Sequence, residues 1–273
     1  MRRTLDLVVA AVIVVGGGVL AASGTLSRLF RRDEPVAAAP TTSAPLGAME
    51  ELFGAAPPPA FRTMRRDEIL EMSGEVMRRH AYTVGQMDRW RSVVSDSVVM
   101  NVPQPPGPGA AQSQLGEFRL RGAMDLFRDA WGYRLMVSGP AARAEASTRV
   151  VEITGVQGRL FPLAVGNRLR FRAVEHGSVE LAGRVRPEAK VVTYEMRVTG
   201  MDRQAYSAST PAVPGPVYVI DLQASAGAPD ESRHVQVHYA PALGAAVRIR
   251  TLGEGPATEE RLVSWEPAAR TGP

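Results

Sequence analysis

Residues 168–174 read RLRFRAV. Arginine occupies positions 168, 170 and 172, and these alternate with Leu169, Phe171 and Ala173. Alternation of charged and apolar residues with a period of two is typical of a β-strand with one solvated and one buried face. The stretch therefore predicts a strand that carries the guanidinium groups of Arg168, Arg170 and Arg172 on a single face.

The same period recurs on both sides of this strand, between turn-forming glycine and proline residues. The expected strands are Tyr133–Val137, Arg149–Thr154, Arg168–Val174, Ser178–Arg184, Val191–Thr199, Val217–Ala224, His234–Tyr239, Ala246–Thr251 and Arg261–Trp265. Short strands at this spacing indicate a mainly antiparallel β-sandwich or β-barrel-like domain over residues 133–267.

Residues 62–132 have an apolar period closer to that of a helix and predict a small helical region. In its first helix, Ile69, Met72 and Val76 form an apolar stripe. Thr83 and Gln86 have the spacing of a capping box, which predicts the start of a second helix. A third helix is expected over residues 116–131. The predicted fold class is therefore α+β, with these helices packed onto the sheet because they bury little surface alone.

The amino-terminal residues 1–32 predict a signal peptide or a single transmembrane anchor. The start is basic at Arg2 and Arg3, and residues 7–22 carry no charge. Ala21 and Ser23, or Ala22 and Gly24, have the small side chains of a cleavage site, whereas the arginines that follow oppose clean export because both flanks are then basic. Either alternative predicts that the protein is periplasmic, or anchored in the inner membrane with the bulk of the chain outside the cytoplasm.

Composition limits the chemistry of this chain of 273 residues. Residues 33–61 are rich in proline and alanine and predict a linker, and residues 268–273 predict a flexible tail. The absence of cysteine excludes disulfide bonds, thiolate metal sites and a cysteine nucleophile. Lys190 is the only lysine, so arginine supplies nearly all the positive charge, and the net charge is +4. Since acidic residues lie among the arginines, we expect no nucleic-acid partner.

Arginine residues are the best candidates for a ligand-binding site. Guanidinium groups bind phosphate and carboxylate through paired N–H donors, so the face of residues 168–174 is a candidate contact for phosphate, carboxylate or an acidic glycan. Arg248 and Arg250 repeat the alternation on another strand, and a continuous basic face would form if the two strands were neighbours. The alternative is an ordinary solvated face. The candidate ligand-binding residues are Arg168, Arg170, Arg172, Arg248 and Arg250.

No motif for nucleotide binding or nucleophilic catalysis occurs in the sequence. His234 and His238 lie on one predicted strand, where a four-residue spacing separates them by roughly 13 Å, too far for one zinc ion. We therefore expect no metal, no cofactor and no catalytic residue. The alternative, an extracytoplasmic hydrolase or glycan-modifying enzyme, would require acidic and histidine side chains to converge in a concave site, for example those of Glu175, His176, Glu195 or His238.

Three segments resemble a known group of proteins. Residues 158–171, GRLFPLAVGNRLRF, resemble the LPL-x-VG-x-x-W-x-Y opening of bacterial envelope β-domains of unknown function, the DUF3108-like group. Residues 198–200 followed by residues 214–220 are similar to a later segment of that group, and residues 239–244, YAPALG, resemble its YAP-x-LG turn. The resemblance covers residues 158–265. It implies an extracytoplasmic β-fold without known catalysis and supplies no functional residues.

These observations together predict a non-enzymatic protein of the bacterial cell envelope that acts as a binding or scaffolding module. The expected partner is an envelope protein, a lipid or a glycan, and the membrane itself if the amino-terminal segment remains uncleaved. A structural spacer without a ligand is the other non-catalytic alternative.

Overall fold

The computed structural model describes residues 51–53, 55–88, 91–100, 112–120, 126, 133–138, 143–181, 184–227, 232–253 and 257–268. In this part of the chain the elements are β1 (Phe61–Leu70), β2 (Val76–Asp88), β3 (Arg91–Met100), β4 (Gln112–Leu120), β5 (Tyr133–Ser138), β6 (Arg143–Arg159), β7 (Arg168–Leu181), β8 (Arg184–Asp202), β9 (Val217–Ser225), β10 (Ser232–Ala240), β11 (Ala245–Leu252) and β12 (Thr258–Pro267). Among these residues, no helix has the length and the apolar character that a membrane span requires.

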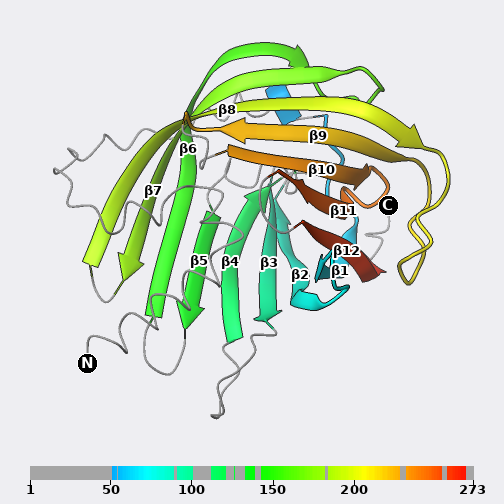
Figure 1. Ribbon diagram of the computed structural model, residues 1–273, viewed down its shortest axis with the longest axis horizontal. Helices are drawn as coiled ribbons and strands as arrows, with labels where there is room; N and C mark the ends of the chain where they lie inside the picture. Colours follow the sequence, from blue (N-terminus) through cyan, green and yellow to red (C-terminus); the bar gives the residue numbers. More distant parts are fainter. Residues whose placement is uncertain are drawn as a thin grey trace.

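The strands form one antiparallel sheet in which each strand pairs with its neighbours in sequence (Figure 1). β1 pairs with β2 on one side and with β12 on the other, so the sheet closes on itself as a barrel. This order needs only hairpin connections between consecutive strands, which are the shortest connections that an antiparallel sheet allows. The prediction of an antiparallel β-structure is confirmed.

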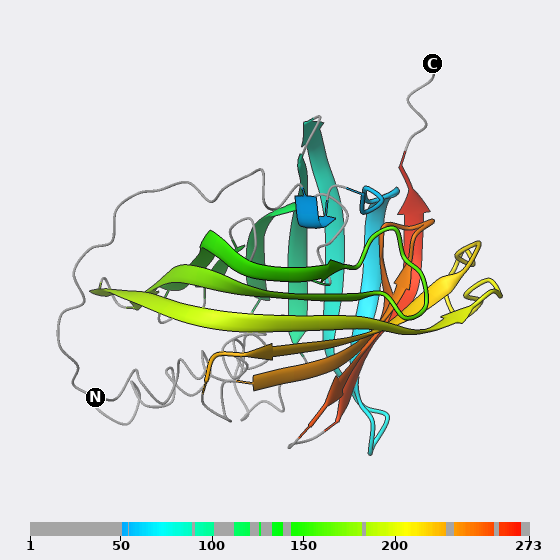
Figure 2. The same ribbon diagram turned by 90° about the horizontal axis from the view of Figure 1, so that it is seen from above.

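Strands β6, β7 and β8 are the longest, with 17, 14 and 19 residues. They bend sharply in Figure 1, and in Figure 2 their green to yellow-green ribbons run across most of the view. Register shifts between β6 and β7 fall between Val150 and Glu152 and between Thr154 and Gln157. Such bulges increase local twist and allow a long strand to bend. The predicted separate strand Ser178–Arg184 is wrong, because β7 continues through Leu181 and β8 starts at Arg184.

The prediction of a helical region over residues 62–132 is wrong wherever the structure describes it. Residues of the first two expected helices lie in β1 and β2, and the expected helix 116–131 begins inside β4. The remainder of that third helix lies outside the described residues, apart from the buried Leu126. Strands from residues 62–132 and from residues 133–267 belong to the same sheet, so the two segments share one structure.

The helical prediction failed because the inward face of β1 and β2 includes polar and charged side chains among its apolar ones. Met64 and Arg66 of β1 are fully buried, and their cross-strand partners Tyr82 and His80 on β2 are also buried. A search for apolar residues at a period of two misses such a strand, since a buried arginine reads as an exposed one. The expected stripe also crosses the turn between the strands, where Gly74 takes φ of 71° and ends any regular element.

The core lies on the inward face of the sheet, and β7 and β8 contribute to it. Leu169, Phe171 and Ala173 are each fully buried there, as the alternation of residues 168–174 predicts. The rings of Phe171 and Tyr194 stack with their centroids 5.2 Å apart. Aromatic pairs of this kind add to the stability that burial alone provides.

The end of the predicted linker 33–61 packs against the barrel. Leu52 and Phe53 are buried, and the Phe53 ring meets the rings of Phe161 and Phe171 edge-on at 6.5 and 6.3 Å. The Ala60 amide donates to the Leu243 carbonyl at 2.9 Å. A linker is therefore the wrong description for residues 51–53 and 55–60, where Leu52, Phe53 and Ala56 belong to the core. The predicted segment 1–32, residues 33–50 and the tail beyond Ala268 lie outside the described residues.

Candidate anion-binding face

The three candidate arginines of β7 lie on the outward face of the sheet. Arg168, Arg170 and Arg172 are exposed, whereas the residues between them are fully buried. Side chains on one face of a strand repeat every second residue, so the three guanidinium groups project on the same side. This arrangement is the one that the alternation in the sequence predicts.

Two further arginines extend this surface onto the neighbouring strands. Arg168 pairs with Arg159 of β6 on one side and with Arg197 of β8 on the other, and both of these residues are exposed. Residues directly opposite one another in antiparallel strands have their Cβ atoms about 5 Å apart, and like charges in such positions are destabilising. We call the surface formed by these five residues the arginine face: Arg159, Arg168, Arg170, Arg172 and Arg197.

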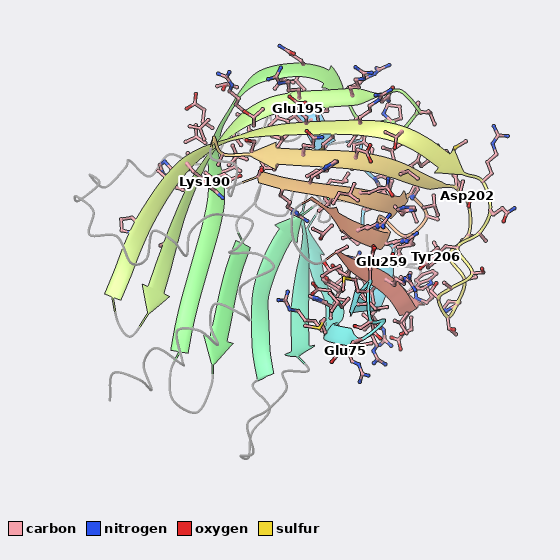
Figure 3. The ribbon with its side chains drawn as sticks, viewed as in Figure 1. Glu75, Lys190, Glu195, Asp202, Tyr206 and Glu259 are labelled. Atoms are coloured by element: carbon pink, nitrogen blue, oxygen red, sulfur yellow. The ribbon has the colours of Figure 1, made fainter. Side chains whose placement is uncertain are left out.

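Few carboxylates neutralise the arginine face. The Arg170 Nε atom lies 3.0 Å from the Glu195 Oε1 atom, and both side chains are about half exposed (Glu195 is labelled in Figure 3). Asp221 pairs with Arg197 in register, and its carboxylate accepts a hydrogen bond of 3.4 Å from the Gln236 side-chain amide. Within the described part of the chain, no ion pair involves the other four members of the face. The face therefore presents a cluster of positive charge to solvent.

Arg248 and Arg250 do not join this cluster. They lie on β11, which β8, β9 and β10 separate from β7, so the hypothesis of one continuous basic face is wrong. The Arg250 guanidinium donates two hydrogen bonds to the Glu71 carboxylate, at 2.5 and 2.9 Å. Arg248 forms an ion pair with Glu259. Both arginines are engaged by carboxylates of the protein itself, which fits a structural role better than ligand binding.

Glu259 is the centre of a second charged cluster, where the long β8–β9 loop meets β12. Its carboxylate is 1% exposed and contacts the guanidinium groups of both Arg248 and Arg261. The loop adds Tyr206, labelled beside Glu259 in Figure 3, and burial raises the pKa of the Tyr206 hydroxyl. The Thr210 amide donates to the Val263 carbonyl at 3.0 Å. Backbone hydrogen bonds therefore fasten the loop to β12, while the buried Glu259 carboxylate engages both arginines of the cluster.

A third charged group lies inside the sheet at the bend of β7 and β8. The Glu175 carboxylate is 1% exposed, accepts a hydrogen bond of 2.5 Å from the Tyr194 hydroxyl, and lies 3.2 Å from the ammonium group of Lys190. Lys190 is the only lysine of the chain. A buried carboxylate normally requires a positive partner and a hydrogen-bond donor, and both are present here. The group satisfies the requirements of a buried ion pair.

Buried charge also occurs between β1, β2 and β12. The fully buried Arg66 guanidinium lies 3.0 Å from the Glu260 carboxylate, which also accepts a hydrogen bond of 2.8 Å from the Tyr82 hydroxyl. Arg66 stacks over the Tyr82 ring at 4.9 Å from the centroid. His80 in turn stacks on Tyr82 with centroids 5.8 Å apart. These contacts explain how an arginine is accommodated in the interior of the sheet.

The residues named for a catalytic alternative do not come together. Glu175 points inward, whereas Glu195 lies on the outward arginine face and His176 follows Glu175 on the opposite side of β7. His238 lies on β10, where burial and, secondarily, the charge of Arg248 lower the pKa of its imidazole. Among the described residues, no three acidic or histidine side chains form a group that could hold a metal ion.

Sequence reasoning found three of the five arginines of the face and missed Arg159 and Arg197. Arg197 shows a clear signal, since Glu195, Arg197 and Thr199 alternate with buried residues along β8 in the same way as the β7 arginines. Arg159 shows none, because Gly155 and Gly158 interrupt the alternation of β6 with φ values of 62° and 74°. The pairing of the strands brings it into place.

Comparisons with known proteins give little information on family or function. No family model matches the chain, and no curated protein matches it. One solved structure, described as a putative exported protein with a YmcC-like fold from Bacteroides fragilis NCTC 9343, aligns with a TM-score of 0.37 and 11% identity. The alignment covers 77% of this chain and 98% of that one. A TM-score of this size does not establish a common fold, and the resemblance of residues 158–265 to the DUF3108-like group stays a prediction.

Proposed function

We propose that this protein is a non-enzymatic binding module of the bacterial cell envelope, and that the arginine face binds anionic groups. The observation that carries the proposal is the row Arg159–Arg168–Arg197, in which three exposed guanidinium groups lie directly opposite one another on adjacent strands. Such a row costs stability, and a local arrangement that opposes folding is most often found where function requires it.

Phosphate or carboxylate is the ligand chemistry that suits this face. A guanidinium group donates two parallel hydrogen bonds to either anion, and several arginines side by side engage a multivalent anion better than single ones. The face spans three adjacent strands, which suits an extended polyanion or a charged layer. The arginine side chains are already exposed to solvent, so an anion can reach them without any rearrangement of the core.

An extracytoplasmic location is part of the proposal and is supported by the sequence. The basic start, the uncharged residues 7–22 and the following small residues form an export segment, which is either cleaved or retained as an anchor. A chain without cysteine is also compatible with an oxidising compartment, since no thiol can pair wrongly there.

Binding of soluble polyanions tests the proposal directly. The purified full chain in mild detergent is titrated with inorganic polyphosphate, and separately with polygalacturonate as the carboxylate probe, over a series of salt concentrations. We expect binding that weakens steeply with salt, because exposed charges are screened over about 10 Å at 0.1 M. The variant R159Q/R168Q/R197Q should lose this binding.

A matched control separates the arginine face from net charge. The variant R62Q/R65Q/R79Q removes the same number of charges from exposed arginines of β1 and β2. We expect it to bind both probes nearly as well as the natural chain. Equal losses in the two variants would contradict the proposal, because binding would then follow total charge and not this face.

A further inference from the structure

We propose that the anion bound by the arginine face is the phosphate layer of an anionic phospholipid membrane, and that the β6–β7 loop enters the apolar boundary beneath it. This inference rests on the proposed function of the arginine face. It adds the class of partner, and the observations that carry it are the shape and composition of the loop between Arg159 and Arg168.

The β6–β7 loop is held in place from within. Leu160 and Phe161 are buried, and the Phe161 ring meets the Tyr239 ring edge-on at 6.1 Å. The Asn167 side-chain amide donates to the carbonyls of Leu160 and Pro162 at 3.2 and 2.8 Å. These contacts fix the loop to the sheet, so its tip has a defined position relative to the arginines at its base.

The tip of this loop is apolar and faces water. Residues 160–166 carry no charge, and Pro162, Ala164 and Val165 are exposed, with Val165 at 57%. Val156, in the bulge of β6 beside the arginine face, is 45% exposed. Single exposed valines are common, but here two lie next to the same charged surface. The fold holds them outward although burial would favour folding.

A basic surface next to an apolar tip matches the chemistry of a membrane interface. Near an anionic bilayer each arginine contributes about 1 kcal/mol of attraction, and exposed apolar side chains gain by entering the boundary between headgroups and acyl chains. Arg159 and Arg168 pair directly at the base of the loop, so the guanidinium groups and the tip belong to one hairpin. A soluble polyanion would use the arginines but would gain nothing from Val165.

The absence of cysteine makes a site-specific test possible. In the full chain, A164C carries a single environment-sensitive fluorophore at the loop tip, and M72C carries the same label at the β1–β2 turn, where Met72 is 89% exposed. Each labelled protein is mixed with vesicles of phosphatidylcholine alone, or of phosphatidylcholine and phosphatidylglycerol in equal parts. A quencher attached to the lipid acyl chains reports contact with the membrane interior.

The expected result is a blue shift and quenching of the A164C label on anionic vesicles alone, with no change for M72C on either vesicle. Since the arginines of the amino-terminal segment also favour anionic vesicles, M72C controls for binding through that segment, and only a change confined to A164C reports the loop. Adding V156S/V165S should lower the ratio of quenched to free label about tenfold, the loss expected from two half-exposed valines. R159Q/R168Q/R197Q should lower it about a hundredfold, at about fivefold per arginine.

Polyphosphate binding distinguishes failure of this inference from failure of the proposed function. If the arginine face binds polyphosphate but the A164C label stays unchanged on anionic vesicles, the membrane inference is overturned and the proposed function stands. If V156S/V165S leaves quenching intact, insertion of the loop is likewise overturned. If neither vesicles nor polyphosphate bind through the arginine face, both proposals fail together.

Discussion

Replacing Arg168 with glutamine should make the protein more stable while weakening its binding of anions. Arg168 lies between Arg159 and Arg197, and each pair places like charges directly opposite across strands. If the charges are about 6 Å apart in water, each pair costs about 0.7 kcal/mol before screening. Screening at 0.1 M salt reduces the total for both pairs to about 0.8 kcal/mol.

Urea unfolding of natural chain and variant measures this difference. We expect R168Q to raise the free energy of unfolding by about 0.8 kcal/mol in 0.1 M salt, which corresponds to about 2–3 °C in melting temperature. In 1 M salt the Debye length falls to about 3 Å, so the gain should nearly vanish. The slope of the unfolding free energy against urea concentration should be the same for both proteins, because the surface exposed on unfolding is unchanged.

R79Q is the matched control for this experiment. Arg79 is also exposed on a strand, but it pairs in register with Asp67, an opposite charge. Its replacement should leave stability unchanged or lower it slightly. The reasoning is refuted if R168Q is destabilising, or if R79Q stabilises the chain as much as R168Q does.

Three further changes test other parts of the structure. G244A should lower the free energy of unfolding by roughly 2–4 kcal/mol. The backbone at Gly244 has φ of +67°, and a Cβ atom there would lie 2.2 Å from the Pro58 carbonyl oxygen. A urea midpoint equal to that of the natural chain would contradict this expectation. K190M should cost about 3 kcal/mol by removing the ammonium group from the buried Glu175 carboxylate, and K190M/E175Q should recover much of the loss. For His238 the folded-state pKa is lowered, so the unfolded chain binds more protons and stability falls as the pH drops below about 6.5. The urea midpoint of H238Q should fall less over that range, and an identical pH profile would show that His238 contributes nothing.

The carboxy-terminal strands could be predicted from the sequence because their buried positions are apolar. Along β7 and β8 every inward residue from Leu169 to Ala173 and from Val192 to Val198 is apolar or aromatic, so the period of two is uninterrupted. The first strands could not be predicted in this way, because Arg66 and His80 occupy inward positions. Arg66 is stabilised there by Glu260, and His80 stacks on Tyr82. Those partners lie far away in the sequence.

The sequence predicted part of the candidate site, because the alternation along a single strand is visible in the sequence. Alternation within one strand shows which residues share a face, and it identified Arg168, Arg170 and Arg172 correctly as exposed. Which strands are neighbours depends on the whole topology. The sequence therefore did not indicate that Arg159 belongs to the arginine face, or that Arg250 forms hydrogen bonds with Glu71 instead. A glutamate in a turn remote in sequence cannot be matched to its arginine without the fold.

Thermal unfolding with and without polyphosphate, for the natural chain and R168Q, tests the central claim most directly. A ligand at a hundred times its dissociation constant stabilises the state that binds it by about 2.7 kcal/mol. We predict that R168Q melts higher than the natural chain without polyphosphate but gains less from its addition, since Arg168 both opposes folding and binds the anion. If polyphosphate raises both melting temperatures equally, the arginine face is not the binding site.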